Sequence, residues 1–164
     1  VESGGKLKSF EYLHDETTDP RPQLIEALIK SIPETGSVVS FNKGFESSRM
    51  KEMAECFPKY EKELQDIIDR LVDPLPIIRS AVYDKGFRGS FSIKKVAPSL
   101  IGEKYSYDGL KIADGGAASQ GFISLISGNL KSKEREQLRF DMLKYCNQDT
   151  MSMVELVNWM RRQG

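Results

Sequence analysis

One short run of β-branched residues, from Ser37 to Phe41, does most to limit the folds open to this chain. Pro33 and Gly36 precede it and Asn42 and Gly44 follow it, so turn residues bound the run on both sides. Its length and apolar character predict a buried strand. Because a helix-like segment comes directly before it, we expect this strand to pair in parallel with its neighbour.

Amphipathic segments predict helices on both sides of this strand. The first begins at Asp19-Pro20-Arg21-Pro22 and ends at Pro33, and the next, at 46–57, carries Phe45, Met50 and Phe57 inward. Further helices are predicted at 59–72, at 92–97, from Asp114 to Ile126, from a Ser132 cap through Leu143, and at 147–161. The pattern indicates an α/β fold with a helix-rich second half.

The first residues predict an antiparallel hairpin. Gly4-Gly5 is typical of a tight turn, and residues 6–14 read as a strand that we expect in the same sheet as residues 37–41. The following His14-Asp15-Glu16 is interpreted as a solvated loop rather than a set of metal ligands, because it lacks a ligand spacing. A length of 164 residues predicts one domain over residues 1–164.

Composition excludes several classes of protein. Lys plus Arg and Asp plus Glu each number 24, so any contact with nucleic acid must be a local patch. Cys56 and Cys146 lie far apart without a Cys-x-x-Cys, which predicts reduced thiols in a cytoplasmic protein. With His14 alone, a multi-histidine site is excluded. No apolar run is long enough for a membrane span, so no membrane contact is expected.

Two stretches carry candidate chemistry. Tyr145 and Asp149 stand four residues apart, which places both on one face of a helix. Glu46 follows the end of the predicted strand, in the stretch that runs from Asn42 to Glu46. An acid at a strand end and an acid on a late helix suggest carboxylates gathered around a metal ion.

A basic helix start adds a third stretch. Ser92 precedes Lys94 and Lys95, and Lys85 and Arg88 lie on the other side of the turn at Ser90. Either these lysines form a solvated face, or they contact phosphates.

These stretches resemble motifs of the DEDD 3′–5′ exonucleases, whose fold is ribonuclease-H-like. Asn42-x-x-Phe45-Glu46 is similar to the second motif, although that motif usually ends in Asp. Tyr145-x-x-x-Asp149 is similar to the third motif of the tyrosine-type branch, and the segment from Phe91 to Ala97 resembles the helix start that precedes it. Nearly the whole chain also resembles the bacterial domain-of-unknown-function family 2779, through Asp19-Pro20-Arg21, Phe41 to Glu46, Gly89 to Lys95 and Tyr145 to Thr150.

The resemblance implies a metal-dependent 3′–5′ exonuclease-like domain that acts on single-stranded DNA or RNA ends by a two-metal mechanism. Glu46 and Asp149 would be ligands of Mg²⁺ or Mn²⁺, since hard ions prefer carboxylate oxygens. Tyr145 would orient the attacking water or help to deprotonate it. The expected catalytic residues are therefore Glu46, Tyr145 and Asp149, and the expected substrate contacts are Asn42, Phe45, Ser92 and Lys94. Asn42 is also expected to fix the strand-to-helix turn.

One departure from these exonucleases matters. Their first motif, Asp-x-Glu on the first strand, has no match before Glu46. The resemblance therefore predicts a ribonuclease-H-like mixed sheet flanked by helices that lacks its first strand, within a longer chain that carries further domains. Such a fragment is expected to be a poor nuclease.

Two alternatives stay open: a non-catalytic module that binds nucleic acid or a partner protein, or a purely structural domain. Under either alternative, Glu46 caps its helix, and Tyr145 packs in the core with its hydroxyl in a hydrogen bond.

Overall fold

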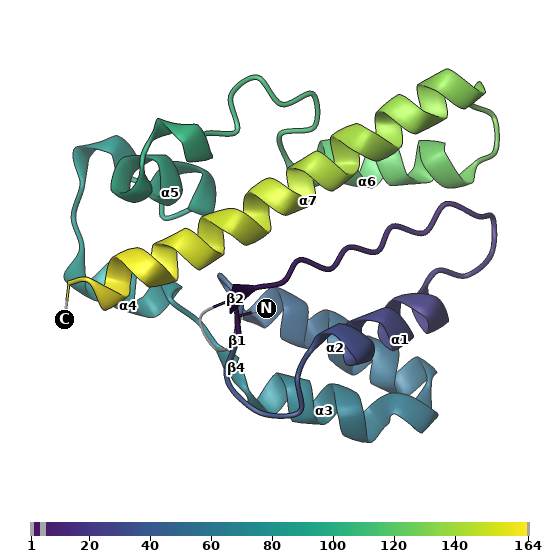
Figure 1. Ribbon diagram of the computed structural model, residues 1–164, viewed down its shortest axis with the longest axis horizontal. Helices are drawn as coiled ribbons and strands as arrows, with labels where there is room; N and C mark the ends of the chain where they lie inside the picture. Colours follow the sequence, from purple (N-terminus) through teal and green to yellow (C-terminus); the bar gives the residue numbers. More distant parts are fainter. Residues whose placement is uncertain (1, 4–5, 164) are drawn as a thin grey trace. The chain divides into compact units, whose positions relative to one another are not determined.

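The computed structural model describes residues 2–3 and 6–163, which form a mostly helical α/β structure (Figure 1). The chain divides into two compact units, Val1–Val72 and Asp73–Gly164. Each unit buries apolar side chains of its own. The prediction that residues 1–164 fold as a single domain stays a prediction.

The first unit contains a small parallel sheet. Strand β3 (Val38–Val39) pairs in parallel with β4 (Leu71–Val72), so the predicted parallel pairing of the β-branched run is confirmed. The backbone N–H of Val38 donates to Arg70 O, and that of Ser40 donates to Val72 O. The strand is shorter than predicted, with two residues instead of five. It is also less buried, since both of these residues are only half-buried.

A second, separate pair of strands stands at the start of the chain. β1 (Glu2–Ser3) and β2 (Lys6–Leu7) are antiparallel, and the predicted turn at Gly4-Gly5 lies outside the described residues. The prediction that residues 6–13 join the sheet of β3 is wrong, since the two pairs form different sheets. Residues 6–12 are all exposed, so they lack the buried face that membership of a packed sheet would require.

Three helices pack around the core of the first unit: α1 (Arg21–Ser31), α2 (Gly44–Cys56) and α3 (Glu61–Asp69), with a short 3₁₀ helix at Pro58–Tyr60. The core consists of Ile25, Met50, Leu64, Ile67 and Leu71. Phe45 was predicted to point inward, yet 65% of it is exposed. Its position lies roughly 140° around α2 from the buried Met50, which explains the error.

The helix predicted at 59–72 ends early, because Leu71–Val72 leaves it and pairs with β3. The proline-rich stretch after β4 also begins a helix that the sequence analysis missed, α4 (Leu75–Ala81). Asp73 Oδ1 accepts a hydrogen bond from Leu75 N at its start. A proline in the first turn of a helix is compatible with helix initiation, so the same residues that end one element begin another.

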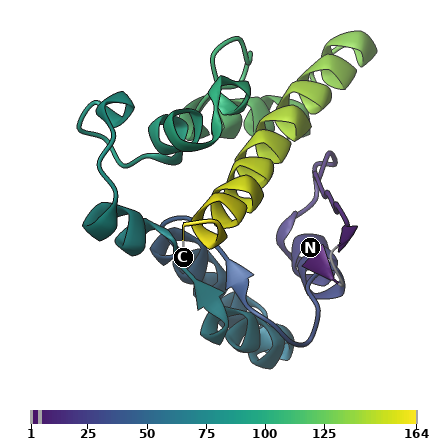
Figure 2. The same cartoon turned by 60° about the vertical axis from the view of Figure 1, so that its left-hand side comes forward.

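In the second unit, α5 (Ile93–Ile101) and α6 (Gly115–Ile126) pack against α7 (Ser132–Arg161), as Figure 2 shows from a second side. Short 3₁₀ helices lie at Lys85–Phe87 and Glu103–Tyr105. The predicted starts of α5 and α6 are confirmed: Ser92 Oγ accepts from Lys94 N, and Asp114 Oδ1 accepts from Ala117 N.

The helices predicted from Ser132 through Leu143 and at 147–161 form one continuous α7. The residues between them, Lys144 to Cys146, include no proline or glycine that would break a helix. Among the helices of residues 2–3 and 6–163, none has the length and apolar character needed to cross a bilayer.

The core of the first unit yields a stability prediction. Leu64 is fully buried, whereas Leu24 on α1 is 38% exposed. We expect Leu64→Ala to lower the free energy of unfolding by about 2–5 kcal/mol, because it leaves a cavity. Leu24→Ala removes the same atoms from a solvated position and should cost about 0.5 kcal/mol. Urea denaturation followed by far-UV circular dichroism measures both, and equal losses would contradict this core.

Candidate functional site

Tyr145 and Asp149 lie on α7, where a buried third residue joins them. The Tyr107 side chain is 5% exposed and comes from the segment between the 3₁₀ helix Glu103–Tyr105 and α6. Its hydroxyl donates to Asp149 Oδ1 at 2.5 Å. The rings of Tyr107 and Tyr145 meet edge to face, with centroids 6.1 Å apart. One carboxylate therefore stands beside two phenols.

Lys94 reaches the same place from the first turn of α5. Its ammonium nitrogen donates to the carbonyl oxygen of Ala113 at 2.5 Å. It also lies 5.5 Å from the ring centroids of both Tyr107 and Tyr145, within the range of cation–π attraction. We call Lys94, Tyr107, Tyr145 and Asp149 the tyrosine–aspartate cluster.

The cluster keeps its phenols protonated. Burial raises the pKa of Tyr145 to about 12, helped by the negative charge of Asp149 and a hydrogen bond to it. Burial and the hydrogen bond to Asp149 raise the pKa of Tyr107 well above its usual range. At neutral pH both hydroxyls are therefore donors. Tyr145 can orient a water or a phosphate oxygen, but it is a poor general base, which disfavours the expected role in deprotonating water.

Gln148 attaches the Tyr107 segment to α7. Its side-chain amide donates to the carbonyl oxygens of Lys104 and Ser106, at 3.4 and 3.3 Å. One turn after Asp149, the fully buried Ser152 hydroxyl lies near that of Tyr107. Ser152 Oγ makes no hydrogen bond of normal geometry there. Sequence reasoning missed Tyr107 and Gln148, because no local pattern links Tyr107 to a residue 42 positions later.

The other predicted residues belong to the first unit. Asn42 has a left-handed backbone, φ 65°, at the turn between β3 and α2, and its carbonyl oxygen accepts from Phe45 N. Asparagine tolerates this conformation better than most residues. Phe45 is exposed, and the Arg49 guanidinium lies 5.6 Å from its ring centroid. Glu46 is exposed in the first turn of α2, where the helix dipole favours a carboxylate.

The predicted metal ligands are divided between the units, with Glu46 in the first and Asp149 in the second. That the two face one cleft stays a prediction. Within the part of the chain that the structure describes, no three His, Cys, Asp or Glu side chains gather into a group able to hold a metal ion. The tyrosine–aspartate cluster contains oxygen atoms, which are the ligands that hard cations prefer, but only one of its groups is a carboxylate.

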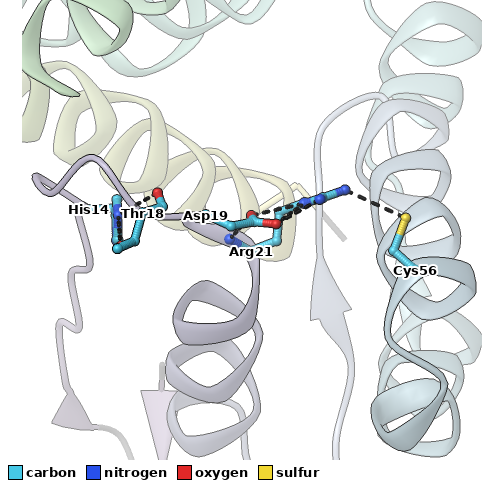
Figure 3. Close-up of polar contacts among 5 residues, drawn as sticks. All are labelled: His14, Thr18, Asp19, Arg21 and Cys56. Carbon is cyan, nitrogen blue, oxygen red and sulfur yellow. Dashed lines mark hydrogen bonds and ion pairs between the residues drawn. The ribbon is translucent and has the colours of Figure 1, made fainter. Parts of the chain in front are cut away.

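The first unit has a polar cluster of its own, which Figure 3 shows. His14, predicted to lie in a solvated loop, is 4% exposed. Its Nδ1 lies 3.0 Å from the Tyr12 hydroxyl, and its Nε2 lies 3.0 Å from the carbonyl oxygen of Thr18. Because both ring nitrogens have partners inside the loop, the imidazole holds the loop together, and the prediction of a solvated residue is wrong.

Beside this loop, Arg21 connects the start of α1 with the end of α2. Arg21 forms an ion pair with Asp19 at 2.7 Å, and its hydrogen bonds lower the pKa of that carboxyl to about 2. The guanidinium donates to Cys56 Sγ at 3.5 Å and lies 5.2 Å from the Phe57 ring centroid (Figure 3). With its charge paired to Asp19 and its guanidinium over the Phe57 ring, Arg21 is accounted for by a structural role.

Comparison with known proteins places the chain in a family. Residues 1–92 match the model of the domain of unknown function DUF2779. The chain belongs to the DUF2779 family. The family match includes the stretch from Asn42 to Glu46 and ends at Ser92, before the tyrosine–aspartate cluster.

Among curated proteins, this DUF2779 chain is 31% identical over 147 residues to the uncharacterized protein MG366 of Mycoplasma genitalium, covering 82% of the chain and 22% of the relative. It is 28% identical over 145 residues to the MG366 homolog of Mycoplasma pneumoniae, and this match covers 81% of the chain and 22% of the relative. The uncharacterized protein UU173 of Ureaplasma parvum is 25% identical over 143 residues, and this match covers 77% of the chain and 21% of the relative. The chain thus spans about a fifth of the length of these relatives. No solved structure matches it.

The electrostatics of the cluster are testable without knowledge of a substrate. Asp149→Asn removes the negative charge and weakens the acceptor beside Tyr145, so the pKa of Tyr145 should fall from about 12 while staying above its ordinary value because of burial. Titration of ¹³C-labelled tyrosine rings by NMR measures this. Glu136→Gln, which changes an exposed acid farther along the same helix, is the control and should leave the pKa of Tyr145 unchanged. A constant Tyr145 pKa in Asp149→Asn would contradict the described geometry.

Proposed function

We propose that this chain carries part of the site of a metal-dependent 3′–5′ exonuclease-like nuclease of ribonuclease-H-like fold, which hydrolyses the ends of single-stranded DNA or RNA. The observation that carries the proposal is the convergence of Tyr145, Asp149 and Lys94. Sequence motifs single out these three residues, and in the structure they lie together on α5 and α7.

The expected ions impose a condition on this proposal. Bound Mg²⁺ or Mn²⁺ would supply an activated hydroxide and relieve charge on the leaving oxygen. Carboxylate and hydroxyl oxygens are suitable donors for such ions, but the cluster's single carboxylate does not fit a pair of them. The proposal therefore requires acidic ligands in addition to Asp149, and the resemblance to the exonuclease motifs names Glu46 as one of them.

The residues of the cluster would orient rather than transfer protons. Tyr107 holds one oxygen of Asp149 by its hydrogen bond. Tyr145 keeps its single proton at neutral pH, and on substrate binding it would turn that proton from Asp149 to a water or a phosphate oxygen. Lys94 steadies both rings and brings a positive charge toward an anionic substrate.

A second candidate function is a non-catalytic module that binds single strands. The exposed Phe45 ring, with the Arg49 guanidinium beside it, favours this alternative. Exposed aromatic rings and arginine planes stack on bases without sequence preference and need no metal ion.

The test is metal-dependent digestion of end-labelled DNA and RNA by the N-terminally extended protein. Asp149→Asn should reduce the rate roughly 100-fold or more, because it removes an anionic group while keeping its shape. Tyr145→Phe should slow kcat with metal binding largely intact, since only a hydroxyl is lost. Calorimetric titration with Mn²⁺ measures whether Tyr145→Phe still binds the metal ion.

Two control variants isolate the site. Glu136→Gln changes an exposed acid of α7 that lies away from the cluster, and Tyr83→Phe changes a tyrosine that is 94% exposed. Both should digest at the rate of the unmodified protein. If the extended protein binds strands but cuts none with any divalent ion, the binding module replaces the enzyme.

A further inference from the structure

We infer that Tyr107 is a positioning residue that orients the Asp149 carboxylate, and that Gln148 holds the segment that carries Tyr107 on α7. This inference deepens the proposed function, and its kinetic consequence rests on that function. Its conformational consequence does not.

The first support is the way in which Tyr107 is fixed. Its side chain is 5% exposed, and its ring lies against the Tyr145 ring and within 5.5 Å of the Lys94 ammonium. A phenol held in this way aims its single proton in one direction, here at Asp149 Oδ1. An aspartate side chain turns about two torsions, χ1 and χ2, so a donor that is fixed against Oδ1 restricts both of them.

The second support is the attachment of the backbone before Tyr107. Gln148 donates to the carbonyl oxygens of Lys104 and Ser106, on both sides of Tyr105. After Tyr107 the chain turns back, with Leu110 N donating to Tyr107 O and Gly109 at φ 84°. Since Gln148 and Asp149 are consecutive, one turn of α7 holds the segment and also receives its hydroxyl.

Ser152 supplies a third, independent observation. Its hydroxyl is fully buried near that of Tyr107 and makes no hydrogen bond of normal geometry. A buried hydroxyl is costly unless it has a polar neighbour. The Tyr107 hydroxyl is such a neighbour, so Asp149 and Ser152 place two polar groups at the end of the Tyr107 ring.

An oriented carboxylate matters for the proposed reaction. Catalytic groups act when they are held near their productive geometry, and a carboxylate that rotates freely loses that advantage. With Oδ1 engaged by Tyr107, Asp149 presents its other oxygen in one direction. Neither Tyr107 nor Gln148 needs to touch the substrate for this.

The experiment uses three variants. Tyr107→Phe keeps the ring and removes the donor, whereas Gln148→Glu keeps the shape and replaces the amide donor by an oxygen facing two carbonyls. Tyr105→Phe is the control, because it lies on the same segment and its hydroxyl has no described hydrogen bond. Three-bond NMR couplings of Asp149 report its χ1 rotamer, and hydrogen exchange of residues 102–110 reports the opening of the segment. The kinetic constants kcat and KM are measured with the extended protein.

We expect one Asp149 rotamer in the unmodified chain and in Tyr105→Phe, and averaged rotamers in Tyr107→Phe and Gln148→Glu. Gln148→Glu should also speed exchange across residues 102–110. In the extended protein, Tyr107→Phe should lower kcat about tenfold or more, the size expected for a lost hydrogen bond to a charged group, with KM changed less than about twofold.

The two proposals can fail separately. Unchanged Asp149 rotamers in both Tyr107→Phe and Gln148→Glu overturn the inference, whatever the kinetics. Averaged rotamers with an unchanged kcat in an active protein overturn its catalytic half. Averaged rotamers in a protein that never cuts nucleic acid support the positioning of Asp149 and reject the nuclease instead.

Discussion

The hydrogen bond from the Tyr107 hydroxyl to the Asp149 carboxylate is the interaction on which the candidate site depends. A buried phenol needs an acceptor, and the carboxylate supplies one from α7. Burial, together with the negative charge of the same carboxylate, raises the pKa of Tyr145 and of Tyr107, so both phenols stay neutral donors. Lys94 then lies against both rings, which brings α5, the Tyr107 segment and α7 together around one acid.

Much of the fold follows from local chemistry, and so it could be predicted. Asp19, Ser92 and Asp114 precede helices because their side chains accept from backbone N–H groups two or three residues later. Elements that depend on distant partners were missed or misjudged. Leu71–Val72 leaves its helix only because β3 offers a partner, and residues 6–13 lack the buried face that their apolar side chains suggested.

The same distinction between local patterns and distant contacts holds for the residues of the candidate site. Helical spacing was enough to place Tyr145 and Asp149 on one face, and the basic helix start pointed to Lys94. Tyr107 could not be found in this way, because its role exists only once the segment before α6 lies on α7. Glu46 belongs to a different unit, so its relation to Asp149 rests on the resemblance to exonuclease motifs rather than on a contact.

The central proposal is that Asp149 binds a metal ion within the tyrosine–aspartate cluster, and a Mn²⁺ titration followed by NMR tests it most directly. Paramagnetic broadening of the ring signals of Tyr107 and Tyr145 reports an ion beside Asp149, and the ring of Tyr83, which is 94% exposed, is the reference. The account predicts that the rings of Tyr107 and Tyr145 broaden at lower Mn²⁺ concentrations than that of Tyr83, and that Asp149→Asn abolishes this difference. Equal broadening of all three rings, or broadening unchanged in Asp149→Asn, would contradict it.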